Sequence, residues 1–225
     1  KLGHVADAIG LIRDELAGQR ALIGFTGSPW TLATYMVEGG SSKEKRRSRE
    51  LFYTDRELFD ELMHTITGAV ADYVDMQIEA GVDAIQIFDS WGGVLAPGAF
   101  HDASMKWVGD IIERIDGRVP VIVFSKNMSH LHEPLTATGA DIIGVNWNRR
   151  LDRVHDSLPD GVGVQGNLDP VLLNTEPELV RRETENILEQ MRGRRGHIFN
   201  LGHGIQPHAR PENVAALVET VVNFA

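Results

Sequence analysis

The sequence predicts an α/β protein whose parallel β-strands are covered by helices. Short apolar runs alternate with amphipathic stretches along the whole chain, which is the pattern of parallel strands joined by helices. Glycines stand shortly before several of these runs, and polar residues follow each of them. Six runs have the character of buried strands, at residues 21–26, 82–89, 119–125, 141–146, 162–165 and 197–200.

The stretches between the runs carry helix signals. Ser28-Pro29 predicts a helix start, with Ser28 as the cap, and Gly39-Gly40 predicts its end. Pro211-Glu212 predicts the start of a last helix. Glycines that turn the chain from a helix back into the sheet are expected at Gly81, Gly139 and Gly161. Apolar residues with helical spacing predict one sheet-facing stripe at Leu58, Leu62, Ile66, Ala69, Val70, Tyr73 and Val74.

Length and composition narrow the class of protein. The chain has 225 residues with 42% hydrophobic content, enough for one substantial core, so residues 1–225 are expected to form a single domain. No apolar run approaches the roughly 20 residues that cross a bilayer. The absence of cysteine excludes disulfides, thiolate nucleophiles and cysteine-ligated metals in this sequence. A net charge of −10 argues against nucleic acid or an anionic membrane as a partner.

The number of strands leaves two architectures open. A closed barrel of parallel strands needs eight, and the sequence predicts six. Either the sheet is open, or two further βα units precede Lys1. The first residue is Lys and no signal-peptide pattern follows it, so we expect the natural N-terminus to lie upstream.

Polar groups gather where the predicted strands end, which is where parallel α/β proteins place their chemistry. Exposure of loops to solvent explains any single one of these polar residues equally well, but their recurrence at every strand end favours a functional site. His203 is the strongest candidate because flanking glycines leave it accessible to donate to a carboxylate, although a satisfied structural histidine is the alternative. The strand ends read Thr26-Gly27-Ser28, Asp89-Ser90, Ser125-Lys126, Asn146-Trp147, Gln165-Gly166-Asn167 and Asn200-Leu201-Gly202-His203-Gly204.

Three further features have two interpretations each. Lys126 could form a Schiff base or bind an anion, or simply be exposed or ion-paired. His130, His132 and Glu133 resemble metal-ligand spacing, but no convincing third ligand accompanies the histidines, so no metal is expected. Residues 43–50 are a basic segment that predicts either a solvated helix start or a lid over an anionic ligand.

Several blocks resemble one enzyme family. The segment IGFTGSPWTLATYMVEGGSSK (residues 23–43) is similar to the signature of uroporphyrinogen decarboxylases. The segments IFDSWGGVLAP (87–97), VQGNLDP (164–170) and FNLGHGIQP (199–207) resemble further blocks of that family in the same order. The resemblance covers the whole chain.

The resemblance implies a fold and an activity. The family fold is a (β/α)8 TIM barrel, and the chain aligns with its last two thirds, so the first two βα units would lie upstream of Lys1. The family's catalytic Arg and Asp belong to those units, and no catalytic residue is expected in this segment. The implied reaction is removal of the four acetate carboxyl groups of uroporphyrinogen III, giving coproporphyrinogen III in heme and tetrapyrrole biosynthesis, without a cofactor or metal. A cytoplasmic homodimer is expected.

The resemblance also assigns substrate-binding residues. Tyr35 matches a substrate-contacting tyrosine, Ser90 a residue that binds a propionate or acetate, and His203 a carboxylate-binding histidine. Two positions depart from the family pattern. Asn146 stands where an Asp is expected before Trp147, and Asn127-Met128 stand where glycines are expected.

Two other functions remain open. A corrinoid-linked methyltransferase shares the barrel, but such enzymes commonly activate a thiol on zinc through His and Cys ligands, and this sequence has no cysteine. A noncatalytic tetrapyrrole-binding protein would keep the barrel and lack the catalytic groups. The upstream sequence separates the binding protein from the decarboxylase, because the Arg-Gln-Ala-Gly-Arg motif with a later Asp would favour the enzyme.

Overall fold

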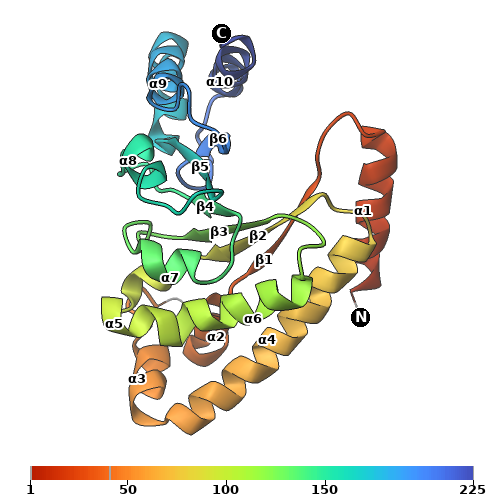
Figure 1. Cartoon of the computed structure of the whole chain (residues 1–225), viewed down its shortest axis with the longest axis vertical. Coiled ribbons are helices and arrows are strands. Elements are labelled where there is room, and N and C mark those ends of the chain that lie inside the picture. The colour runs from red at the N-terminus through yellow and green to blue at the C-terminus, as the bar shows by residue number, and fades with distance from the viewer. Residues whose placement is uncertain (1, 41, 225) are drawn as a thin grey trace. The chain divides into compact units, whose positions relative to one another are not determined.

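A computed structural model of the chain describes residues 2–40 and 42–224. The chain divides into two compact units, Lys1–Asp141 (the first unit) and Ile142–Ala225 (the second unit). Figure 1 labels the elements of both in chain order. Among the described residues, no helix has the length and apolar character that a bilayer crossing requires.

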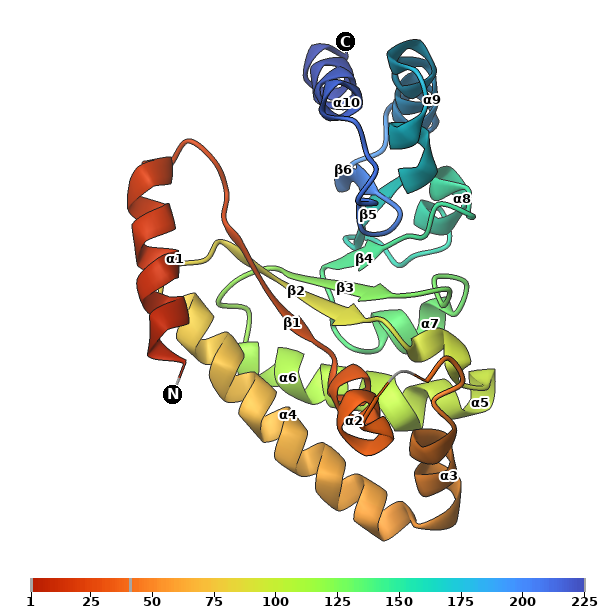
Figure 2. The same cartoon turned by 180° about the vertical axis from the view of Figure 1, so that it is seen from behind.

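The first unit contains three parallel strands with β2 in the middle. β1 (Ile23–Gly27) pairs with β2 (Ala84–Asp89), and β2 pairs with β3 (Val121–Ser125). In this register Gly27 lies opposite Phe88, and Asp89 lies opposite Ser125. The carboxyl ends of all three strands therefore meet at one edge, seen from two sides in Figures 1 and 2.

Helices of the first unit cover these strands. α4 and α6 pack against each other, and α4 also contacts β1 and β2, as the long yellow-orange helix in Figure 2 shows. The helical elements of the unit are α1 (Gly3–Leu16), α2 (Pro29–Glu38), α3 (Arg46–Thr54), α4 (Arg56–Glu79), the 3-10 turn η1 (Gly92–Val94), α5 (Pro97–Phe100), the π-turn η2 (His101–Met105), α6 (Lys106–Ile115) and α7 (His132–Thr136).

The buried stripe of α4 is offset by about one residue from the sequence prediction. The prediction is confirmed at Ile66, Val70 and Val74, but Leu58 is 50% exposed and Ala69 is exposed. The offset arises because aromatic and sulphur-containing residues one position later complete a continuous helical stripe. The buried α4 residues are Phe59, Met63, Ile66, Thr67, Val70, Ala71, Val74 and Gln77.

Buried Gln77 ties α4 to the backbone of β1. Its Oε1 accepts from Phe25 N at 3.0 Å, and its Nε2 donates to Phe25 O at 3.1 Å. A Cβ atom added at Gly24 would lie 2.7 Å from Gln77 Oε1, so a larger residue there would push the amide away. The helix thus satisfies polar groups of β1 that the β2 ladder does not reach.

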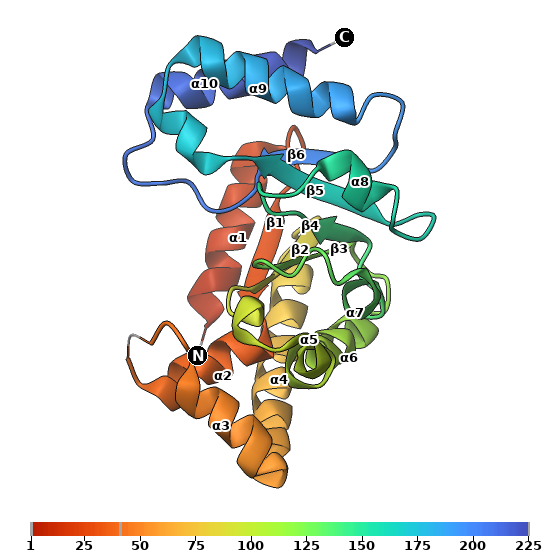
Figure 3. The same cartoon turned by 90° about the vertical axis from the view of Figure 1, so that its left-hand side faces the viewer.

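The second unit repeats the arrangement with three more parallel strands. β5 (Gly163–Leu168) lies between β4 (Ile142–Gly144) and β6 (His197–Leu201). α9 (Pro177–Gln190) and α10 (Pro211–Asn223) pack against each other, which Figure 3 shows from the side. The remaining helical elements are α8 (Leu151–His155) and the 3-10 turn η3 (Pro170–Asn174).

The second unit contains two apolar clusters and several ion pairs, among them a bidentate one. The clusters consist of Val145, Leu151, Val154, Val164 and Met191, and of Leu168, Leu173 and Val180. Arg194 binds Asp156 in a bidentate manner, with both N–O distances at 2.8 Å. This guanidinium lowers the pKa of Asp156 to about 2.

Most of the predicted elements are confirmed. All six strands form, with ends that coincide with the prediction or differ from it by up to three residues, and β5 continues to Leu168. Ser28 caps α2 by accepting from Thr31 N, with Pro29 at the first helical position, and Pro211 begins α10. The three glycines expected between helix and strand, Gly81, Gly139 and Gly161, all have positive φ.

The strand-centred core of the first unit can be tested at Ile87, which is fully buried in β2. We expect Ile87→Ala to lower the free energy of unfolding by about 3 kcal/mol, because lost burial and the remaining cavity add. Leu11→Ala is the control, since Leu11 on α1 is 72% exposed and should change stability by less than about 0.5 kcal/mol. Urea unfolding followed by circular dichroism measures both, and equal effects would contradict this core assignment.

Candidate functional site

The polar strand ends of the first unit converge on one buried carboxyl group, that of Asp89. Its Oδ1 accepts from Ser28 Oγ at 3.0 Å and from Thr31 Oγ1 at 3.2 Å, and its Oδ2 accepts from Ser125 Oγ at 2.7 Å. The first two residues belong to the β1 side and Ser125 ends β3. Asp89, which ends β2, therefore joins all three strand ends through hydroxyl groups.

Burial sets the protonation of this group. Asp89 is fully buried, and removal from water raises the pKa of its carboxyl group. The hydrogen bonds from Ser125, Ser28 and Thr31 act in the opposite direction but do not cancel the shift. Asp89 therefore resists ionisation more than an ordinary aspartate does.

Gly92 is required by the closeness of the chain to this carboxyl group. A Cβ atom added at Gly92 would lie 2.2 Å from Asp89 Oδ2 and 2.3 Å from Ser125 Oγ. Real side chains do not approach so closely, so the turn after β2 needs a glycine here. The conformation of this turn then determines the positions of Ser90 and Trp91.

Ser90 stands at the point where the turn leaves β2. It is half-buried, and its backbone N donates to Thr31 Oγ1 at 3.0 Å. Thr31 thus bridges Asp89 and Ser90. The structure places Ser90 at the strand edge that the sequence predicted, and its proposed role as a substrate ligand stays a prediction.

Tyr35 lies on α2 close to the same turn. Its ring is 51% exposed and stands edge-on to Trp91, with the ring centroids 6.5 Å apart. Trp91 is held from the other side, because its backbone O accepts from Nε1 of fully buried Trp30 at 3.1 Å. The structure therefore brings two predicted residues, Tyr35 and Ser90, to one aromatic edge around Trp91.

His203 belongs to the second unit, directly after β6. Its Nδ1 accepts from Gly204 N at 2.7 Å, so in the neutral ring the proton resides on Nε2, which is a donor. The ring stands edge-on to Trp147, with centroids 6.0 Å apart. A Cβ atom added at Gly202 would lie 2.2 Å from Trp147 N, so Gly202 allows this close packing.

Asn146 and Asn167 organise the loop that carries Trp147. Asn167 is 5% exposed, and its Nδ2 donates to Asn146 O at 2.9 Å and to Arg149 O at 2.7 Å. Asn146, which stands where an Asp was expected, is fully buried. An amide avoids the desolvation cost that a carboxylate would incur at such a position.

The second departure from the expected pattern also has a structural explanation. Asn127 adopts a left-handed backbone with φ of +64°. Asn tolerates this region better than other non-glycine residues, so it can stand where glycine was expected. The adjacent chain packs closely, because a Cβ atom at Gly93 would lie 2.8 Å from Lys126 O and 3.2 Å from Asn127 Cβ.

The basic segment 43–50 is mostly a solvated helix start, one of its two predicted interpretations. Arg46 pairs with Glu50 at 3.0 Å and Arg49 with Glu44 at 3.9 Å, all near the surface. Lys45 is the exception, since it is only 2% exposed and packs on Tyr35 and Trp91. Sequence reasoning missed Lys45 because a run of charges gives no signal that one member turns inward.

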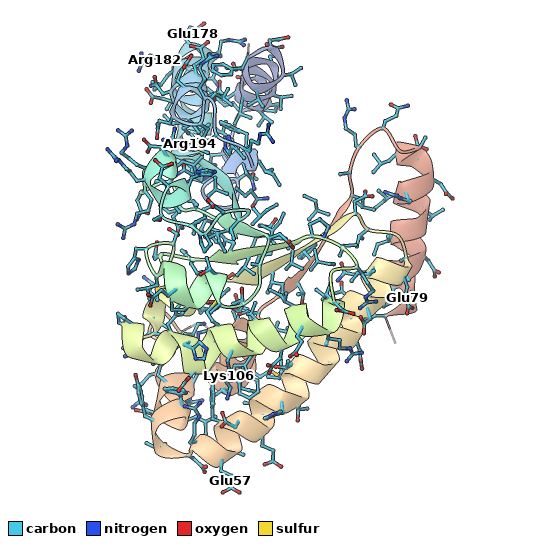
Figure 4. The ribbon with its side chains drawn as sticks, viewed as in Figure 1. Glu57, Glu79, Lys106, Glu178, Arg182 and Arg194 are labelled. Carbon is cyan, nitrogen blue, oxygen red and sulfur yellow. The ribbon has the colours of Figure 1, made fainter. Side chains whose placement is uncertain are left out.

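Charged groups also lie on the helices, away from these strand ends. Figure 4 labels Glu57 and Glu79 at the two ends of α4 and Lys106 at the start of α6, and Glu178 and Arg182 on α9. Among the residues whose side chains are described, no cluster of three or more His, Asp or Glu residues could hold a metal ion. The side chain of His132, part of the weak metal-like spacing, lies outside the described set.

The close approach at Gly92 gives a direct test. We expect Gly92→Ala to destabilise the protein by about 2 kcal/mol, because the added methyl must displace Asp89 or Ser125. Gly98→Ala is the matched control, since a Cβ atom at Gly98 meets nothing within 4 Å. Thermal unfolding monitored by circular dichroism compares the two, and an unchanged melting temperature in Gly92→Ala would refute the tight packing.

Asp89 gives a pH-dependent test. Its raised pKa favours the neutral acid in the folded state, so its contribution is complete below the unfolded pKa and is lost as the pH rises through the folded pKa. Asp89→Asn removes this loss. We expect the stability of the variant relative to the wild type to improve by about 1 kcal/mol or more between pH 4 and alkaline pH. Urea unfolding across this range measures the trend, with exposed Asp7→Asn as control; a trend of opposite sign would refute the shift.

Comparison with known proteins identifies the family. The family model described as uroporphyrinogen decarboxylase (URO-D) matches residues 1–224. The chain is 45% identical to uroporphyrinogen decarboxylase of Alkalilimnicola ehrlichii, over 98% of this chain and 62% of that protein. It is 42% identical to the protein of the same name from Pseudoalteromonas translucida, over 100% and 65%. The chain thus spans less than two thirds of the length of these relatives.

Two solved structures share the fold. A methyltransferase from Methanosarcina mazei matches 98% of this chain and 64% of its own with a TM-score of 0.86 at 20% identity. A B12-independent methionine synthase from Shewanella matches 96% and 64% with a TM-score of 0.65 at 14% identity. At such identities the likeness concerns the fold alone. It confirms the expected α/β class with parallel strands, which is consistent with part of a (β/α)8 barrel.

The strand-end blocks noted in the sequence, the fold and the match over residues 1–224 agree with one another. The chain belongs to the uroporphyrinogen decarboxylase family.

Proposed function

We propose that this chain is part of an enzyme that converts uroporphyrinogen III to coproporphyrinogen III by removing the carboxyl groups of four acetate side chains. The observation that carries the proposal is the 41–45% identity to uroporphyrinogen decarboxylases over nearly the whole chain. The activity of the whole protein is a proposal because the chain spans only part of the length of these relatives.

The proposed chemistry needs no electron acceptor beyond the substrate. Protonation of a pyrrole α-carbon makes the ring cationic, and the bond between the acetate methylene and its carboxylate then breaks. Carbon dioxide leaves and the electron pair enters the ring. A proton delivered to the methylene carbon gives the methyl group, and loss of the α-carbon proton restores the pyrrole. The protein has to orient the substrate, stabilise charge and deliver protons.

The residues of this chain supply groups that orient the substrate. The Tyr35 hydroxyl can donate or accept, the Ser90 hydroxyl stands where β2 ends, and His203 has a donor at Nε2 because Nδ1 accepts from Gly204. Each can hydrogen-bond an acetate or propionate carboxylate. The proposed catalytic Arg and Asp belong to a part of the family fold that this chain does not cover.

Some expectations stay proposals. We propose that residues 1–225 belong to a single barrel domain, which the uninterrupted family match across Asp141 supports. A cytoplasmic homodimer stays a prediction from the family resemblance, and size-exclusion chromatography with light scattering tests its oligomeric state. The fold shared with the Methanosarcina mazei methyltransferase does not favour methyl transfer, because it shows the fold alone and this sequence contains no cysteine.

The test is anaerobic incubation of the full-length protein with uroporphyrinogen III and chromatography of the oxidised products. We expect porphyrins with seven to four carboxyl groups to accumulate. His203→Asn and Tyr35→Phe should each lower kcat/KM by about tenfold or more, since each removes a hydrogen bond to a charged group.

Matched controls are available for both variants. His208 is exposed and Tyr53 is 60% exposed on α3, so His208→Asn and Tyr53→Phe should leave turnover unchanged. Tight binding of the substrate without product would contradict the enzyme and favour a tetrapyrrole-binding protein. Full activity in the His203 and Tyr35 variants would refute the assigned contacts while leaving the reaction in place.

A further inference from the structure

Lys45 is a buried cation inside a segment that otherwise faces solvent. It stands at the N-terminal end of α3 with φ of +47°, and it is 2% exposed. Neighbouring Arg46 and Arg49 remain near the surface, with side chains 75% and 37% exposed. Because its backbone is left-handed, Lys45 does not continue the helical conformation of α3.

The buried side chain lies against the two aromatic residues of the candidate site. Lys45 Nζ is 3.8 Å from the centroid of the Trp91 ring and 5.0 Å from that of Tyr35. Aromatic faces attract cations and offset part of the cost of removing an ammonium group from water. Lys45, Trp91 and Tyr35 therefore form one cluster, which we call the aromatic corner.

This corner contains donors whose acceptors are missing from the described part of the chain. No described carboxylate lies within 4.0 Å of Lys45 Nζ, and no described residue accepts a hydrogen bond from it. Trp91 Nε1 is also buried without a hydrogen-bond partner among the described residues. Buried donors are nearly always paired in folded proteins, so the unpaired Trp91 Nε1, beside an ammonium group without a described counter-ion, points to a ligand with an acceptor.

Glu38 does not form an ion pair with the ammonium group of Lys45. Glu38 Oε1 already accepts from Ser48 N at 3.0 Å and from Ser48 Oγ at 2.9 Å. Burial tends to raise the pKa of Glu38, but hydrogen bonds from Ser48 and Ser42 and the charge of Lys45 together bring it below its ordinary value. Glu38 thus caps α3 and leaves the ammonium group on the aromatic corner without a direct counter-ion.

We propose that the aromatic corner is a carboxylate subsite, in which Lys45 supplies the positive charge and Trp91 Nε1 a second donor. The ligand is an acetate or propionate carboxylate of the tetrapyrrole that Tyr35 contacts. The inference rests on the proposed function, and it adds a positive charge beside Tyr35 and Ser90, the two hydroxyl residues assigned to the site in the first unit. A carboxylate that binds here satisfies both donors at once.

The experiment uses the full-length protein and compares four variants. Lys45→Met keeps an unbranched side chain and removes the charge, whereas Lys45→Arg keeps both the charge and the attraction to aromatic rings. Trp91→Phe keeps a ring and removes the N–H group. Lys43→Met is the matched control, because it removes one exposed positive charge from the same segment.

Two readouts are taken, the kinetics with uroporphyrinogen III and the dissociation constant for uroporphyrin III, an octacarboxylate with both acetate and propionate groups, from its fluorescence. We expect Lys45→Met to raise KM and this Kd by about tenfold with kcat changed less than about twofold, since a buried charge acts through a weakly screening medium. Trp91→Phe should raise both by about threefold. Lys45→Arg and Lys43→Met should stay within about twofold of wild type. Added salt should weaken binding less in Lys45→Met than in wild type.

The outcomes separate this inference from the proposed function. Normal KM and Kd in Lys45→Met, with an active wild type, overturn the subsite and leave the decarboxylase standing. A wild type that binds uroporphyrin but forms no product overturns the reaction, and weaker binding in Lys45→Met then still supports the subsite. A lower melting temperature in Lys45→Met with unchanged Kd would show that Lys45 only stabilises the fold. If wild type neither reacts nor binds, both proposals are wrong.

Discussion

The candidate site in the first unit depends on the buried carboxyl group of Asp89. Parallel strands bring their ends to one edge, but hydrogen bonds along the ladder stop there and leave the loops to diverge. Hydroxyl groups from Ser28, Thr31 and Ser125 reach Asp89 from both neighbouring strand ends. Burial raises the pKa of this carboxyl group, and the three hydroxyl groups supply the hydrogen bonds that a buried carboxyl group requires.

The hydrogen bonds around Asp89 also fix the turn that follows β2. Thr31 bonds both to Asp89 and to the backbone of Ser90, and Gly92 lets the turn fold back onto the carboxyl group. The turn thereby positions the Trp91 ring edge-on to Tyr35, and Lys45 Nζ packs on the face of this ring. Asp89, which is not proposed to contact the substrate, thus determines the positions of the residues that are.

Sequence reasoning succeeded where a pattern has one physical cause. Alternating apolar runs gave all six strands, and the Ser28-Pro29 pair gave the start of α2, because capping chemistry is local. It placed the α4 stripe one residue off at Leu58, since only packing shows which side of an apolar-rich helix is covered. It could not identify Asp89 as the buried centre of the hydrogen-bonded cluster, because that depends on contacts between residues distant in sequence. It could not identify Lys45 as a buried cation, because that depends on one backbone angle, φ at Lys45.

The net charge of −10 is unfavourable for binding the proposed substrate, which carries eight carboxylates, and a buried cation offers a solution. Exposed pairs such as Arg46 and Glu50 are screened by water and salt, so they contribute little to the field at a binding site. A buried ammonium group without a direct counter-ion acts at short range through a less polar medium. One residue such as Lys45 can therefore determine the local sign of the potential although the chain as a whole is acidic. The total charge then governs solubility and long-range repulsion, whereas the position of a few buried cations governs recognition.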